Sequence, residues 1–248
     1  MDISPIQSSL LWKCRRLEVR TLFGLIAVTA MLALVLWFGR YWGIDKATKE
    51  CRSRSAAHNM AVLRRRDAVA APGKLVFLGS STVESLDTSA VASHALNLGL
   101  GGDRIETLLA RARRYESVHT ARGVVLNIGI NDVLVDCQPI AMAMYRAQLQ
   151  ALARGKPLIW LGLQPLRGVA AERCNGAVNR FIDATNELQQ EACRSIENCL
   201  WVEHPLRGKN VRRSSPELLE ADGIHMRRAG YAMLEAALAV ASSRLIPQ

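Results

Sequence analysis

The chain has 248 residues, half of them hydrophobic, which is enough for one domain of ordinary size and an appendage. Its net charge is +10, and a basic chain of this kind can bind nucleic acid or an anionic membrane surface. No zinc-ligand spacing and no aromatic-rich RNA-binding motif accompanies the basic residues, so a nucleic-acid partner is not expected.

An uncharged segment of nineteen residues occupies positions 21–39. As a helix it would span roughly 28 Å at about 1.5 Å per residue, close to the ~30 Å hydrocarbon core of a bilayer. Trp37, Tyr41 and Trp42 cluster at its end, where amphipathic rings favour the membrane interface. The segment is long for a cleaved signal peptide and no small-x-small cleavage pattern follows it. We therefore predict an uncleaved transmembrane anchor over 21–39, after a short cytoplasmic N-terminus over 1–20.

Residues 40–73 are polar and rich in basic side chains, and the sequence "APG" ends the segment. No proline or glycine interrupts 44–70, so the pattern predicts a basic helical stalk. Much of the excess positive charge lies here, beside the predicted membrane span, where anionic lipid headgroups would attract it. The main domain is predicted to begin at residue 74.

Basic residues flank both ends of the anchor almost equally, so the positive-inside rule does not orient it. The main domain holds four cysteines, an even number that an oxidising compartment could pair: Cys137, Cys174, Cys193 and Cys199. Three pairings are possible, of which Cys137–Cys174 with Cys193–Cys199 is the first to test; four buried free thiols are the alternative. Pairing favours a periplasmic domain on a single-pass protein of a bacterial inner membrane.

From residue 74 onward, short apolar runs alternate with longer helical patterns. The helical patterns include 104–118, 139–155 and 227–245. The runs are predicted strands, and near-continuous apolar character suits strands buried on both faces: 75–78, 95–98, 124–128, 158–161 and 200–202. Alternation of this kind predicts an α/β fold with a parallel sheet and helices on both faces.

Ligands of such a sheet bind beyond the carboxyl ends of the strands, which directs attention to the residues there. Two serines follow the first strand in 79–81, "NLGLGGD" spans 97–103, "GIND" spans 129–132, and "DGIH" at 222–225 precedes the last helix. Taken alone, each is more often a turn or a cap than a functional site.

Together these motifs contain the parts needed for acyl transfer. A serine hydroxyl needs a base to take its proton, and His225 can be that base. Asp222, three residues earlier, can fix the tautomer of the imidazole and balance its charge. The glycine-rich backbone at 101–102, the Asn131 amide and the serine's own N–H can donate to the oxyanion of a tetrahedral intermediate.

At this point the chain resembles the SGNH (GDSL-type) hydrolases, over about residues 74–246. Their four blocks occur in order as Gly-x-Ser, Asn-x-x-x-x-Gly-Asp, Gly-x-Asn-Asp and Asp-x-x-His. The resemblance implies a three-layer α/β/α sandwich with a flavodoxin-like sheet, and hydrolysis of esters or thioesters or acyl transfer without a metal or cofactor. It assigns the nucleophile to Ser81, the triad partners to Asp222 and His225, and the oxyanion hole to Gly102, Asn131 and the Ser81 N–H.

Two positions depart from the commonest pattern of that family. Ser80 stands where aspartate is usual, and Met226 follows the histidine in place of proline or leucine. Neither departure removes a member of the triad.

The leading functional hypothesis is a membrane-anchored serine esterase that acts outside the cytoplasm on an acyl or acetyl ester of an envelope glycan or lipid. An acyltransferase that passes the acyl group to a sugar hydroxyl would use the same residues. A non-catalytic subunit of an envelope complex is a third reading, against which the complete set of five site residues argues. The four blocks do not distinguish hydrolysis from transfer, and they carry no information on oligomeric state.

Overall fold

The computed structural model describes residues 31, 34, 37, 57–207 and 217–246. The predicted cytoplasmic N-terminus and most of the predicted anchor and stalk lie outside these residues. Within the anchor the described positions are helical and exposed: Met31, Leu34 and Trp37. Among all described residues, no helix combines the length and apolar character needed to cross a membrane. Of the two compact units of the chain, Met1–His58 and Asn59–Gln248, the second contains the sheet.

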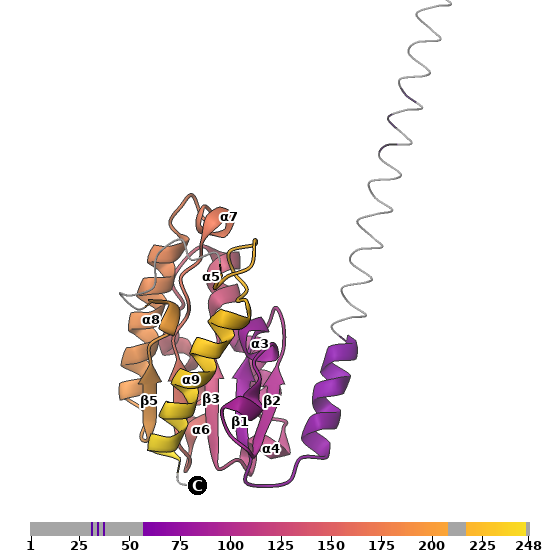
Figure 1. Cartoon of the computed structure of the whole chain (residues 1–248), viewed down its shortest axis with the longest axis vertical. Helices are drawn as coiled ribbons and strands as arrows, with labels where there is room; N and C mark the ends of the chain where they lie inside the picture. The colour runs from indigo at the N-terminus through magenta and orange to yellow at the C-terminus, as the bar shows by residue number, and fades with distance from the viewer. Residues whose placement is uncertain (1–30, 32–33, 35–36, 38–56, 208–216, 247–248) are drawn as a thin grey trace, which may run out of the picture. The chain divides into compact units, whose positions relative to one another are not determined.

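A parallel five-stranded sheet with the strand order β2-β1-β3-β4-β5 forms the centre of this unit (Figure 1). The strands are β1 (Leu75–Gly79), β2 (Ala95–Gly99), β3 (Gly123–Asn127), β4 (Leu158–Leu161) and β5 (Cys199–Val202). Every residue of β1, β3 and β4 is buried, as the continuous apolar runs predicted. The α/β class, the five strands and their parallel pairing are therefore confirmed.

Alternate side chains of the strands enter two separate cores, so helices cover both faces of the sheet. Leu75 and Phe77 pack with Leu234 and Leu238 of α9 on one face. Val76 and Leu78 enter the other core, which includes side chains of α3, α6 and α8. The α-helices after β1 are α2 (Ser81–Glu84), α3 (Ile105–Ala112), α4 (Glu116–His119), α5 (Ile130–Asp136), α6 (Arg146–Ala153), α7 (Gly168–Ala171), α8 (Val178–Arg194) and α9 (Arg228–Leu245).

Two predicted helices differ from the structure. The pattern over 104–118 forms two helices, α3 and α4, and the helix predicted over 139–155 is α-helical only from Arg146, after the 3₁₀ turn η2 (Met142–Tyr145). The break before α4 has a tertiary cause, because Asp67 accepts hydrogen bonds from the backbone N–H groups of Glu116 and Ser117 and so satisfies the start of a new helix.

Asp67 belongs to a helix over 57–68, which is the described part of the predicted stalk. Leu63 of this helix is 3 % exposed and is part of the core that includes Val76 and Leu78. The compact unit thus begins at Asn59 and includes the end of the segment predicted as a stalk.

Both disulfides of the favoured pairing are present. Cys137 and Cys174 join with a Cα–Cα distance of 5.3 Å, and Cys193 and Cys199 with one of 5.4 Å. The first disulfide connects the C-terminal cap of α5 to the loop after α7. It therefore constrains the helix that carries Asn131.

Candidate active site

The turn after β1 buries one of its two serines and presents the other. Gly79 ends the strand where a Cβ atom would lie 2.4 Å from the carbonyl oxygen of Asn127, so this close approach requires glycine. Ser80 is 0 % exposed, whereas Ser81 is partly exposed at the first position of α2. Only Ser81 is accessible to a substrate.

His225 and Asp222 lie beside Ser81, although 144 residues separate Ser81 from His225 in the sequence. The Nε2 atom of His225 is 3.1 Å from the Oγ atom of Ser81, and its Nδ1 atom is 2.5 Å from Oδ2 of Asp222. Since a carboxylate can only accept, Nδ1 carries the proton and Nε2 accepts from the serine hydroxyl. This chain of contacts can move a proton from Ser81 to His225.

Each carboxylate oxygen of Asp222 has its own task. Oδ2 contacts the imidazole, while Oδ1 accepts from the backbone N–H groups of Ile224 at 2.9 Å and His225 at 3.0 Å. Partial burial opposes ionisation of Asp222, but the hydrogen bonds from His225 and Ile224 outweigh it and hold the pKa of this carboxyl below its ordinary value. Asp222 therefore stays ionised at neutral pH.

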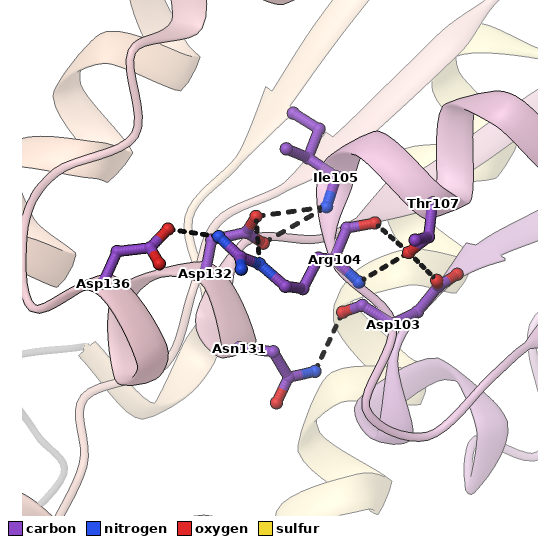
Figure 2. Close-up of polar contacts among 7 residues, drawn as sticks. All are labelled: Asp103, Arg104, Ile105, Thr107, Asn131, Asp132 and Asp136. Carbon is purple, nitrogen blue, oxygen red and sulfur yellow. Dashed lines mark hydrogen bonds and ion pairs between the residues drawn. The ribbon is translucent and has the colours of Figure 1, made fainter. Parts of the chain in front are cut away.

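The predicted oxyanion donors lie on the loop after β2 and on α5. Gly102 has a φ of +77°, a left-handed conformation that favours glycine. Within the described part of the chain, the backbone N–H groups of Ser81 and Gly102 donate to no protein acceptor. Asn131 donates through Nδ2 to the carbonyl of Asp103 at 2.9 Å, which fixes the orientation of its amide (Figure 2). The second N–H of that amide has no partner among the described residues, so it can face a ligand.

The next residue, Asp132, ties α5 to the start of α3. Its carboxylate accepts from the backbone N–H of Ile105 at 3.2 Å and from Nε of Arg104 at 3.3 Å (Figure 2). Burial raises the pKa of Asp132, and the hydrogen bonds from Ile105 and Arg104 oppose that shift. Arg104 also pairs with Asp136 one turn further along α5.

The loop that holds Asp222 and His225 rests on the loop after β4. Arg167 donates its backbone N–H to the carbonyl of Gly223 at 3.0 Å, and a Cβ atom on Gly223 would lie 1.9 Å from the carbonyl oxygen of Arg167. Gln164, which is 1 % exposed, donates through Nε2 to the carbonyl of Ile224 at 3.2 Å. The carbonyl groups of Gly223 and Ile224, just before His225, are thus both bonded to the segment 164–167.

Two amides of α8 hold this buried segment in turn. The side chain of Asn186 bonds to both the N–H and the C=O of Leu163, at 2.7 and 3.1 Å. The side chain of Asn179 does the same to Leu166, at 2.8 and 3.0 Å. The helix therefore supports the loop of His225 through the loop after β4.

The structure brings His225 into contact with both Ser81 and Asp222. Gly102 and Asn131 lie on two segments that the hydrogen bond from Asn131 to Asp103 connects. The sequence interpretation missed Gln164 and the amides of α8. Gln164 could have been found, because it lies just beyond the fourth predicted strand. Asn186 is buried and Asn179 is half-buried in α8, and nothing in their spacing marks either one as a support of the loop after β4.

Comparisons with known proteins identify the family of the chain. The model of the GDSL-like Lipase/Acylhydrolase family matches residues 77–233. No curated protein sequence matches the chain significantly.

Similar solved structures include a lipase/acylhydrolase from Enterococcus faecalis, which is 22 % identical in sequence and has a TM-score of 0.57. The match covers 71 % of this chain and 98 % of that chain. A GDSL-like lipase from Bacteroides thetaiotaomicron has 18 % identity, coverage of 77 % and 97 %, and a TM-score of 0.57. An acetyl xylan esterase from Geobacillus stearothermophilus has 21 % identity, coverage of 71 % and 94 %, and a TM-score of 0.54. At these identities the likeness shows a common fold.

Proposed function

Because the chain belongs to the GDSL-like lipase/acylhydrolase family and is an ester-hydrolysing enzyme, we propose that it is a serine esterase with Ser81 as its nucleophile. The observation that carries the proposal is the hydrogen-bonded series from Ser81 through His225 to Asp222. Such a series activates a hydroxyl that is otherwise a weak nucleophile.

In the first step, Oγ of Ser81 attacks the ester carbonyl carbon while Nε2 of His225 takes the hydroxyl proton. Asp222 stabilises the imidazolium through Nδ1, and the oxyanion accepts hydrogen bonds from Ser81 N–H, Gly102 N–H and the Asn131 amide. Collapse of the tetrahedral intermediate breaks the ester C–O bond, and His225 returns the proton to the leaving alcohol. An acyl-serine remains.

In the second step, His225 takes a proton from water as the water oxygen attacks the acyl carbon. Collapse of this second intermediate releases the carboxylic acid and returns the proton to Ser81. The enzyme is thus restored without a metal or cofactor taking part in the proposed steps.

The proposed substrate is an acyl ester, including an acetyl ester, of an envelope glycan or lipid. The apolar segment 21–39 supports a membrane anchor, and the two disulfides support a domain that faces an oxidising, periplasm-like compartment. One structurally similar protein is an acetyl xylan esterase, which is consistent with a small acyl group on a glycan.

The test compares two neighbouring serines in the full chain, with a short-chain aryl ester as substrate. Ser81→Ala is expected to reduce hydrolysis to background, because it removes the nucleophile, whereas Ser80→Ala should retain most of the activity. Mass spectrometry of the wild-type enzyme should find the acyl group on Ser81. An inactive Ser80→Ala variant beside an active Ser81→Ala variant would identify Ser80 as the nucleophile and contradict the proposal.

A further inference from the structure

A buried ion pair adjoins the proposed oxyanion hole, because Asp103 follows Gly102 and bonds to Asn131. Arg111 of α3 and Asp103 of the loop after β2 have side chains that are 5 % and 3 % exposed. The Nε atom of Arg111 is 2.7 Å from Oδ2 of Asp103. Neither charge has a part in the proton transfers of the proposed reaction.

The guanidinium of Arg111 also reaches the turn of the nucleophile. Its Nη2 atom donates to the carbonyl of Gly79 at 3.3 Å, and Gly79 lies two residues before Ser81. The same carbonyl accepts from the backbone N–H of Leu100 at 2.9 Å. One side chain therefore connects the turn of Ser81 to the loop that presents Gly102.

Asp103 connects the remaining donor to the same point. Its carboxylate contacts Arg111. The same carboxylate accepts from the hydroxyl of Thr107, and its backbone carbonyl accepts from Nδ2 of Asn131 at 2.9 Å, as Figure 2 shows. Gly102 is the residue immediately before it. The positions of all three proposed oxyanion donors thus depend on the placement of Asp103.

A buried ion pair is a poor source of stability, because removing two charges from water offsets much of their attraction. Arginine suits a different purpose here. Its rigid planar fork can bond to a carboxylate and a carbonyl at a fixed angle, whereas a lysine ammonium is a point charge on a flexible stem. The contacts of Arg111 use that fork to fix one segment relative to another.

We infer that Asp103 and Arg111 are positioning residues of the oxyanion hole, an inference that rests on the proposed function. They set the distance between the N–H groups of Ser81 and Gly102 and fix the position of the Asn131 amide relative to both groups. They act through these donors and do not touch the substrate.

The principal test is Arg111→Lys in the full chain, purified in a non-ionic detergent, with 4-nitrophenyl acetate as substrate. Lysine keeps the charge beside Asp103 but cannot hold both acceptors in the geometry of the arginine fork. We expect kcat to fall at least about tenfold, since small misplacements of reacting groups are costly, while KM changes less than twofold. The affinity for phenylboronic acid, which forms a tetrahedral adduct on the serine, should fall by a similar factor.

Two further variants separate positioning from stability. Asp103→Asn combined with Arg111→Gln removes both charges and leaves amides that can bond to each other, so it should fold and still lose kcat. Lys156→Met is the matched control. The Lys156 ammonium donates to the carbonyl of Val118 at 2.6 Å near the amino end of the sheet, so its loss should lower the melting temperature and leave kcat unchanged.

The pH at which activity is half-maximal should not move in Arg111→Lys, because the Asp222–His225 contact is untouched. Wild-type kcat and boronate affinity in Arg111→Lys would overturn the inference while the esterase proposal stands. A kcat loss that only follows the unfolded fraction, or a loss with a shifted pH profile and unchanged boronate affinity, would also overturn it. Wild-type protein that hydrolyses no ester would overturn the proposed function, and this inference with it.

Discussion

The nucleophile side of the site, at the ends of β1, β2 and β3, is held by buried charges, whereas the base side, in the loop before α9, is held by neutral amides. On the first side, Arg111 bonds to Asp103 and Asp132 to the backbone of Ile105. On the second side, Gln164 bonds to the carbonyl of Ile224, and Asn179 and Asn186 of α8 support the segment beneath it.

The two sides also differ in exposure. The side chains of His225 and Asp222 are 46 % and 45 % exposed, while those of Arg111 and Asp103 are almost completely buried. Oxyanion donors must point at a charge that develops during the reaction, so their geometry has to be set in advance. The base carries its orienting carboxylate in the same short loop, so the pair can shift together. Buried groups support both sides, since Gln164 is also buried, but buried charges are found on the side whose geometry cannot adjust during the reaction.

Apart from changes to the triad itself, the largest loss of kcat is expected from changes on the nucleophile side. Asn131→Ala removes one proposed oxyanion donor and should lower kcat by about a hundredfold, the usual scale for such a loss. Steady-state kinetics with an aryl ester measures the effect, and KM should change little. Asn131→Ala with wild-type turnover would remove this residue from the oxyanion hole.

A smaller loss is expected on the base side. Gln164→Leu leaves the carbonyl of Ile224 without its buried donor and should lower kcat by about tenfold, because a loosened loop positions His225 less often near Ser81. The pH dependence should keep its midpoint, since Asp222 and His225 move as a unit. Thermal unfolding, followed in parallel, separates this effect from a loss of folded protein. A drop of a hundredfold or more would mean that the base side is as intolerant as the oxyanion side.

His204, which follows β5, should affect folding stability and leave turnover unchanged. Burial, reinforced by the nearby positive charge of Arg207, lowers the pKa of His204 from 6.5 to about 3 in the folded protein. The unfolded chain therefore binds an extra proton between these values, and stability falls as the pH falls through 6.5 toward 3. The contribution is about 1.4 kcal/mol per pH unit within that window.

The variant His204→Asn isolates the contribution of His204 to the pH dependence of stability. Nδ1 of His204 accepts from the N–H of Leu206 at 3.2 Å, and the asparagine oxygen can accept from the same N–H. Urea unfolding at pH 7 and pH 4.5 should show a smaller loss of stability on acidification in the variant than in the wild type. Equal losses in the two proteins would show that His204 is not the residue that titrates.

Local patterns in the sequence were sufficient for the strands, and together with the resemblance to a known family they predicted the residues of the candidate site. The continuous apolar runs of β1, β3 and β4 require burial on both faces, and that requirement implies a parallel sheet covered by helices. In a parallel sheet the carboxyl ends of these strands lie at one edge, and Ser81 and Asn131 are found there. Helix boundaries were less predictable, as the separation of α3 from α4 by contacts of Asp67 illustrates.

By itself, then, the sequence determined the strands and the four short motifs of the candidate site, because spacing and apolar periodicity are properties of neighbouring residues. Only the tertiary structure decided that Ser80 is buried while Ser81 is accessible, and that Arg111 spans from Asp103 to Gly79. It also decided that Gln164 supports Ile224 across 60 residues. Contacts of this kind join segments distant in the chain, and their energies depend on burial and on the angle between donor and acceptor, which no local pattern encodes.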